Sequence, residues 1–497
     1  MNTALVGRAL AFLRRSDGGV WARTLRSGVW VSLSVLIVNS LQIVRSFVLA
    51  RLLTPEMFGL MALCLIVIRG IEVFSETGVR PALIHRREGF EEARDTAFCV
   101  MAVRGFVLAG IATAIGPAAA WYYDEPRLVP LIATLALSFA IVGFSNINTI
   151  RLEKELQFRR LAHLEQFGAI ASFVIVVSLA YWMRSVWALV IGQVLGAAAG
   201  VVASYLMVPG RPRFVFRRDL ARELLRYGRF VTGLAIVLFF TTEADNMVVG
   251  KILGLDALGF YLIAYTLANL PATHIAKVLS RIMFPAYAIL RDDPKRLVAG
   301  YLATSEVVGV VSLAAAAGLY TLAEDIVRIG YGPRWLAAVP AMRILALFGA
   351  LRAVTMINGY VFNAIGRPNL PFYLNSAKLV VILATIVPAT RQYGLVGTSL
   401  AVTLPSAAFF FVSMAQLDRF AQVPWRASIR VLIRPVLTAT AIIVVVGASR
   451  SHMSSVGLPA LVALIGMGGA LAGLLNIDVF KRVYREQRYH RPTAAPA

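Results

Sequence analysis

The sequence has little charge and few of the residues that build soluble catalytic or metal sites. Only 15% of its 497 residues are charged and 59% are hydrophobic, whereas a soluble domain carries roughly 25% charged residues. Its only cysteines are Cys64 and Cys99, both inside apolar segments, and they cannot form a zinc cluster or a disulfide framework. These deficits exclude a soluble enzyme, a disordered chain and a secreted disulfide scaffold. The apolar excess indicates an all-α membrane protein, because helices satisfy their own backbone groups in lipid.

The charge that is present is mostly of one sign. The chain has 49 Lys and Arg residues against 26 Asp and Glu residues, a net charge of +23. Most of the basic residues lie in short connectors between apolar stretches, which is the pattern that orients a membrane protein. No basic face comes with a soluble fold that would present it to nucleic acid. We therefore expect no nucleic-acid partner, no cofactor and no metal.

Fourteen apolar segments approach the roughly 20 residues that cross a bilayer. They lie at about 28–52, 57–79, 95–117, 128–150, 163–183, 186–208, 229–250, 257–281, 298–320, 336–362, 371–390, 394–416, 429–448 and 457–476. With both ends in the cytoplasm, 35 of the 49 basic residues fall on the cytoplasmic side, Lys378 among them, and eight on the other side. This bias predicts an even number of spans and two cytoplasmic termini.

The chain repeats itself at an offset of 200 residues. Arg51 corresponds to Lys251 and Gly59 to Gly259, and both stretches begin on the same predicted side. The repeat predicts two pseudo-symmetric six-helix lobes, related by an axis along the membrane normal, with a site between them. We expect a basic cytoplasmic N-terminal segment (1–27), an N-lobe (28–208), a basic cytoplasmic linker (209–228), a C-lobe (229–416), two further helices (417–476) and a basic cytoplasmic tail (477–497).

Four short motifs carry a family resemblance: LARLLTPEMFGL at 49–60, GVRPALI at 78–84, YGPRW at 331–335 and GRP at 366–368. They resemble the polysaccharide and oligosaccharide flippases of bacterial inner membranes, exporter-type members of the multidrug/oligosaccharidyl-lipid/polysaccharide superfamily. The resemblance implies that an undecaprenyl-pyrophosphate-linked oligosaccharide moves to the outer leaflet by alternating access, without catalysis. It also implies that membrane lipids, a polysaccharide polymerase and chain-length machinery are partners.

Polar residues inside the spans are candidates for the substrate site, since ionisable groups in a bilayer usually face a cavity. Arginines suit a pyrophosphate, and aromatic and amide groups suit sugars. Arginines near a span end can also snorkel to the interface, and tyrosines commonly serve in packing. The candidate substrate-binding residues are Asn39, Gln42, Arg45, Arg104, Tyr261, Tyr265, Asn269 and Arg352.

Four further residues are candidates for gating or ion coupling: Arg69, Glu72, Glu243 and Asp245. Arg69 and Glu72 are spaced for an ion pair on one helix face. Arg45 and Asp245 are 200 residues apart, so they occupy equivalent positions in the two repeats. We predict that they pair across the cavity in one conformation.

Two other functions fit parts of the sequence. A cation- or drug-exporting antiporter of the same superfamily would use Glu243 and Asp245, but the arginines of the first half disfavour a cationic cargo. A membrane-embedded polysaccharide enzyme would present an acid, a histidine or a metal site on a sizeable outer loop. Outer connectors such as 122–127 are too short for that.

Overall fold

The computed structural model describes residues 37–75, 79–85, 89–155, 157–222, 232–290, 293–453 and 456–479. Throughout these residues the regular elements are helices, with no strand among them. The all-α fold class is thereby confirmed. The expected N-terminal segment 1–27 and most of the expected tail 477–497 lie outside the described residues.

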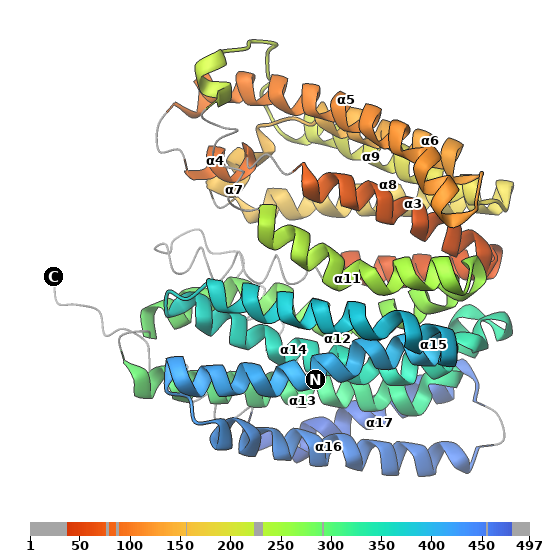
Figure 1. The fold of residues 1–497 in the computed structure, drawn as a ribbon, viewed down its shortest axis with the longest axis vertical. Coiled ribbons are helices and arrows are strands. Elements are labelled where there is room, and N and C mark those ends of the chain that lie inside the picture. The colour runs from red at the N-terminus through yellow and green to blue at the C-terminus, as the bar shows by residue number, and fades with distance from the viewer. Residues whose placement is uncertain are drawn as a thin grey trace, which may run out of the picture. The chain divides into compact units, whose positions relative to one another are not determined.

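The chain forms two compact units, residues 1–53 with 64–235 and residues 54–63 with 236–497. The first contains a helix at 37–52, the later part of α3 (Pro55–Phe74), α4 (Val79–His85), α5 (Phe90–Tyr123), α6 (Leu128–Gly143), α7 (Thr149–Lys154), α8 (Phe158–Met183) and α9 (Val186–Met207). Within this unit α5 packs on α6, α8 packs on α9, and α6 packs on α9 (Figure 1).

The second unit is built round α14. It contains α11 (Thr232–Ile252), α12 (Leu255–Leu290), α13 (Pro294–Ile326), α14 (Val339–Ala364), α15 (Asn369–Ala421), α16 (Trp425–Ser451) and α17 (Leu458–Leu475). Helices α12, α13 and α15 each pack on α14, and α16 packs on α13. The core that they share includes the fully buried Tyr301, Ile357 and Leu417.

Helix α15 is bent by one glycine. Gly394 has φ +58° and ψ −138°, a backbone conformation that side chains with a Cβ atom rarely adopt. It separates the two apolar segments expected at 371–390 and 394–416. Two spans can therefore follow one another with almost no connecting loop.

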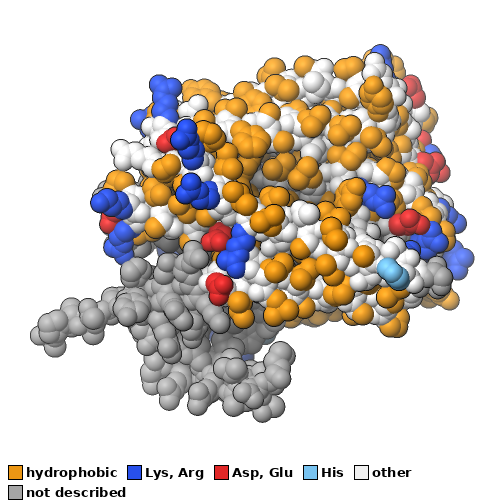
Figure 2. Space-filling view, turned by 90° about the horizontal axis from the view of Figure 1, so that it is seen from below, with side chains coloured by type: hydrophobic (Ala, Val, Ile, Leu, Met, Phe, Trp, Pro, Cys, Tyr) orange, Lys and Arg blue, Asp and Glu red, His pale blue; other side chains and the backbone are white. Residues whose placement is uncertain are grey.

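Nine helices of the described residues are long and apolar enough to cross a membrane. The described part of each of the fourteen expected segments lies mainly on helix, with two of the segments on α15. The number of crossings stays a prediction, as does the division into lobes. Figure 2 shows one face on which hydrophobic side chains cover the middle, while Lys and Arg side chains lie mainly toward the margins. The protein is a multi-pass membrane protein.

Candidate functional site

A close crossing of α12 and α14 positions the central polar residues of the second unit. A Cβ atom on Gly349 would lie 2.0 Å from the carbonyl oxygen of Ala268, so only glycine permits this approach. Asn269 follows directly on α12, and Arg352 lies about one turn further along α14. The crossing therefore brings together two polar residues that are 83 positions apart in the chain.

Arg352 is held by neutral oxygens. Its Nη1 atom donates to Asn269 Oδ1 at 3.1 Å and to the Tyr265 hydroxyl at 3.3 Å. Asn269 is itself fixed, because its Nδ2 atom donates to the Tyr265 carbonyl at 3.0 Å. The guanidinium is thus oriented by hydrogen bonds that leave its positive charge uncompensated.

A second cation stands close by. Lys378 of α15 is partly buried and is repelled electrostatically by Arg352. The sequence analysis counted Lys378 among the cytoplasmic charges that set topology, but it lies nine residues past the start of α15. An anion beside them would favour the charged form of both groups, because an opposite charge nearby stabilises an ionised side chain.

Helix α11 supplies the acids of the same unit. Glu243, Asp245 and Asn246 are all buried. Asn246 donates from its side chain to Glu243 Oε2 at 3.0 Å and from its backbone to Asp245 Oδ1 at 2.9 Å. The Asn246 Oδ1 atom is buried and accepts no hydrogen bond from the described residues. The acids therefore lie in a polar group in which the Asn246 Oδ1 atom can still accept a hydrogen bond.

Two tyrosines connect the acids with the cations. The Tyr261 hydroxyl donates to Asp245 Oδ2 at 2.8 Å, and the rings of Tyr261 and Tyr265 are 6.2 Å apart. Tyr265 lies within electrostatic range of both Asp245 and Arg352. Tyr261 is fully buried, so in this state its ring offers no face to a sugar. The structure thus brings six candidates from the second half into one polar row: Glu243, Asp245, Tyr261, Tyr265, Asn269 and Arg352.

The first unit places its own candidates separately. Arg45 is half-buried and its Nη1 atom donates to Ser172 Oγ of α8 at 3.3 Å. Asn39 is buried and Gln42 is exposed on the same helix. The predicted pairing of Arg45 with Asp245 stays a prediction.

The remaining candidates of the first unit gather near the end of α3. Arg104 donates to the carbonyl and to the hydroxyl of Ser75, both at 3.1 Å. Arg69 and Glu72 are both exposed on α3. Arg104 is therefore fixed to the end of α3, while the ion pair proposed for Arg69 and Glu72 stays a prediction.

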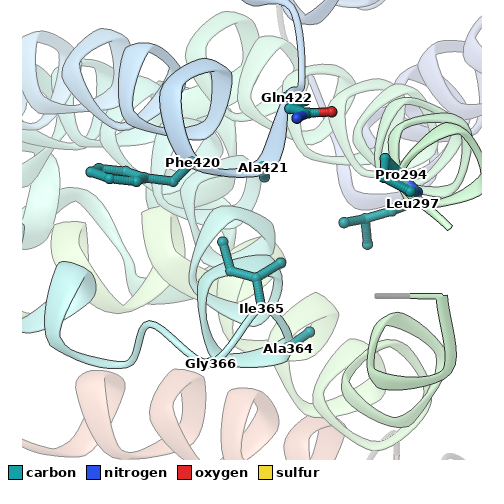
Figure 3. A pocket seen from close by; sticks show the side chains of 8 residues that line it. All are labelled: Pro294, Leu297, Ala364, Ile365, Gly366, Phe420, Ala421 and Gln422. Carbon is teal, nitrogen blue, oxygen red and sulfur yellow. The ribbon is translucent and has the colours of Figure 1, made fainter. Parts of the chain in front are cut away.

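A cavity of about 400 Å³ lies at the ends of α13, α14 and α15, away from these polar residues in the chain (Figure 3). Beside it the Arg367 guanidinium stacks 4.2 Å from the Phe420 ring. The side chains that line the cavity are mainly apolar: Pro294, Leu297, Ala364, Ile365, Phe420 and Ala421, with Gly366 and Gln422. This lining does not suit a charged head group.

Two polar residues of this group, Lys378 and Asn246, are not among the candidates named from the sequence. The signal for Lys378 was present, since an ionisable residue inside an apolar segment usually faces a cavity. Its place near the end of the segment made it resemble a topological charge. Nothing in the sequence signals that Asn246 bonds to both neighbouring acids.

The family of this chain follows from its sequence. The polysaccharide biosynthesis protein family matches residues 48–340, more than half of the chain. The chain belongs to this family. It is 26% identical to the lipopolysaccharide biosynthesis protein WzxC of Escherichia coli K12, over 77% of this chain and 78% of that protein. It is 26% identical to the teichuronic acid biosynthesis protein TuaB of Bacillus subtilis 168, over 86% of this chain and 89% of that protein.

Solved structures show the same fold. The lipid II flippase MurJ in an inward closed conformation has a TM-score of 0.70 at 14% identity, covering 92% of this chain and 99% of that chain. An inward-facing multidrug resistance MATE transporter has a TM-score of 0.64 at 15% identity, covering 80% of this chain and 99% of that chain. Because both identities are low, these likenesses describe the fold of this family member and not its cargo.

Proposed function

We propose that this family member moves undecaprenyl-pyrophosphate-linked oligosaccharide units across the bacterial inner membrane for surface polysaccharide synthesis. The observation that carries the proposal is the Arg352 guanidinium, which neutral oxygens of Asn269 and Tyr265 hold within the helical body. The partly buried Lys378 adds a second positive charge on α15 of the same unit. A pyrophosphate brings negative charges that need partners once its water is removed. Guanidinium groups supply charge-assisted hydrogen bonds for that purpose. The names of WzxC and TuaB support a polysaccharide precursor as cargo.

The same proposal assigns separate roles to the other polar residues. Arg352 and Lys378 hold the head group, and Asn269 and Tyr265 keep Arg352 aimed at it. In the first unit Asn39, Gln42, Arg45 and Arg104 complete the path by alternating access. Both termini lie in the cytoplasm. A polysaccharide polymerase and chain-length machinery take the product onward, and the chain itself carries out no covalent chemistry.

Gating is assigned to the acids. Asp245 pairs with Tyr261 in the described state, and we infer that it exchanges this partner for Arg45 in another. The exchange double variant Arg45→Asp with Asp245→Arg is expected to transport where either single variant does not. Normal transport by Asp245→Asn alone would contradict the pairing.

The deciding experiment is a lipid extract from a strain that lacks this gene. Accumulated pyrophosphate-linked oligosaccharide, together with loss of a surface polysaccharide, is the expected result. Complementation with Arg352→Gln should leave the lipid accumulated. Complementation with Arg343→Gln should clear it, because Arg343 is exposed on the same helix.

One observation favours a second function, a cation-exporting antiporter. Glu243 and Asp245 are buried acids of the kind that bind a cation. A dye-sensitivity test in parallel separates the two functions. Unchanged lipids with raised sensitivity to cationic dyes would overturn the flippase proposal in favour of the antiporter.

A further inference from the structure

A basic and aromatic stretch that is mostly without regular secondary structure follows α9 in the first unit. We call residues 211–218, RPRFVFRR in sequence, the Arg-Phe segment. The backbone before it is held by Asn146, whose Nδ2 atom donates to the carbonyls of Val208 at 3.1 Å and Gly210 at 3.0 Å. The segment therefore leaves α9 at a fixed point.

The Arg-Phe segment is also fastened to the beginning of α5. The Arg213 backbone N–H donates to Asp95 Oδ1 at 3.1 Å. The Thr96 hydroxyl accepts from the Arg217 N–H at 3.2 Å and donates to the Val215 carbonyl at 3.3 Å. These bonds satisfy backbone groups that an extended strand without a neighbour would leave to water. The segment is thus an anchored strip rather than a loose connector.

This anchored strip turns large apolar side chains outward. Phe214 is 73% exposed and Phe216 is 62% exposed. The Phe214 ring contacts only the edge of a neighbour, with its centroid 5.1 Å from that of Phe98. Exposed aromatic side chains on a fixed backbone indicate a contact surface.

The charged side chains of the segment itself are all arginines, and neighbouring acids balance part of their charge. Arg211, Arg213, Arg217 and Arg218 are all exposed. Arg217 shares its charge with acids that lie 3.5–3.8 Å away. Within the described part of the chain, Arg211 and Arg218 have no ion-pair partner. The strip therefore presents a positive field with apolar rings set into it.

The strip lies at the beginning of the apolar segment of α5. Asp95 and Thr96 lie where the apolar segment 95–117 of α5 begins, which is where a span meets the interface. At that depth phosphate groups lie beside the first carbons of the acyl chains. Arginines suit the former and aromatic rings the latter.

We propose that the Arg-Phe segment binds the head groups of anionic phospholipids in the leaflet at this end of α5. The arginines contact the phosphates, while Phe214 and Phe216 insert among the upper acyl carbons. Charge complementarity selects anionic lipid over zwitterionic lipid, since each basic residue near an anionic surface strengthens binding about five-fold. The segment thereby fixes the depth of the first unit in the membrane.

Native mass spectrometry of the full-length detergent-solubilised protein tests this proposal. The wild type and the variant Arg211→Gln/Arg218→Gln are titrated with phosphatidylglycerol and, separately, with phosphatidylcholine. The matched control is Arg184→Gln/Arg391→Gln, which removes two exposed arginines elsewhere and the same charge. We expect the first variant to lose about five-fold in phosphatidylglycerol affinity for each arginine, and the control to bind as the wild type does.

Three outcomes would overturn the proposal. One is an equal loss of phosphatidylglycerol affinity in the control variant, which would show that the effect comes from net charge alone. Another is equal affinity of the wild type for the two lipids. The third is displacement of phosphatidylglycerol by inorganic phosphate alone, which would make the strip a phosphate site. A second variant, Phe214→Ser/Phe216→Ser, keeps every charge and is expected to weaken long-chain phosphatidylglycerol but not its short-chain soluble form.

Discussion

Gly59 and Gly259 make reciprocal contacts, each with the first residue of the other's helix. Gly59 of α3 lies against Leu255, the first residue of α12, and Gly259 of α12 lies against Pro55, the first residue of α3. A Cβ atom on Gly59 would lie 2.0 Å from the Leu255 carbonyl oxygen, and one on Gly259 would lie 2.1 Å from the Pro55 carbonyl oxygen. Gly59 and Gly259 are 200 positions apart in the sequence, and so are Pro55 and Leu255. The two contacts are therefore equivalent under the sequence repeat.

The close contacts at Gly59 and Gly259 predict that adding one methyl group at either position lowers the free energy of unfolding. Gly59→Ala or Gly259→Ala forces the two backbones apart, so we expect a loss of about 1–3 kcal/mol in unfolding free energy. Gly318→Ala is the control, because a Cβ atom there meets nothing within 4 Å and alanine favours a helix. Thermal unfolding of the purified protein measures the difference. Equal unfolding temperatures for Gly59→Ala and Gly318→Ala would contradict the close crossing.

Arg352 is expected to respond to shape as well as charge. Arg352→Lys keeps the charge but moves it to a compact ammonium, and it loses the planar guanidinium whose Nη1 atom donates to both the Asn269 and the Tyr265 oxygens. We expect transport to fall at least about ten-fold in Arg352→Gln, since a hydrogen bond to a charged group contributes about 1.5–3 kcal/mol, and to fall by less in Arg352→Lys. Transport of lipid-linked oligosaccharide into vesicles measures both. Wild-type rates in Arg352→Gln would remove this residue from the site.

The bond between Tyr261 and Asp245 predicts a stability effect. Tyr261→Phe removes the donor to a buried carboxylate, so the acid is left short of a partner at a cost of about 1–3 kcal/mol. Tyr393→Phe is the matched control, because Tyr393 is 66% exposed. Thermal unfolding should separate the two variants. If they unfold together, the hydroxyl of Tyr261 does not stabilise Asp245.

Asn146 is expected to control how firmly the Arg-Phe segment is held. Asn146→Ala removes the donors to the Val208 and Gly210 carbonyls, each bond contributing about 0.5–1.5 kcal/mol. Trypsin should then cut within 211–218 several-fold faster than in the wild type. Asn375→Ala, which removes one bond to a carbonyl in its own helix, should leave the rate unchanged. Equal cleavage of the two variants would show that other contacts hold the segment.

Acid is expected to weaken the connector between α5 and α6. The Arg127 guanidinium hydrogen bonds to Glu125 and lowers the pKa of that carboxyl. Because the pKa is lowered on folding, the pair stabilises the protein above the ordinary glutamate range and loses this contribution as pH falls through the lowered pKa. Arg127 is 54% exposed at its side chain, so the contribution stays below about 1 kcal/mol.

The variant Arg127→Gln measures this contribution. Its unfolding temperature should lie below that of the wild type near neutral pH, and the two should converge in acid once Glu125 is protonated. A difference that persists unchanged through the acid range would attribute the effect of Arg127 to packing instead.

The helices could be predicted from sequence because each depends on local properties. An apolar run of sufficient length dictates a helix in lipid, and the described part of each of the fourteen segments lies mainly on helix. The sharp bend at Gly394 matches the expected break between two spans. The sequence also indicates close approach where α3 crosses α12, since Gly59 and Gly259 are both part of the repeat.

The sequence names candidates for the site but not their contacts. Arg352 and Asn269 were both candidates, yet their hydrogen bond depends on how closely α12 approaches α14 at Gly349. Arg45 lies beside Ser172, 127 positions away, a contact that no local pattern encodes. The charge count places Lys378 on the cytoplasmic side, because the sequence pattern alone does not show that helices distant in sequence partly bury its side chain.

The polar row that runs from Asp245 through the two tyrosines to Arg352 bears on the speed of a carrier. A cargo that binds too tightly is released too slowly. A purely cationic pocket would therefore bind an anionic cargo well and transport it poorly. In this protein an anion bound near Arg352 is repelled by the carboxylate of Asp245 at the other end of the row. Residence time can thus be set by the distance between opposite charges on one unit, rather than by the strength of either contact.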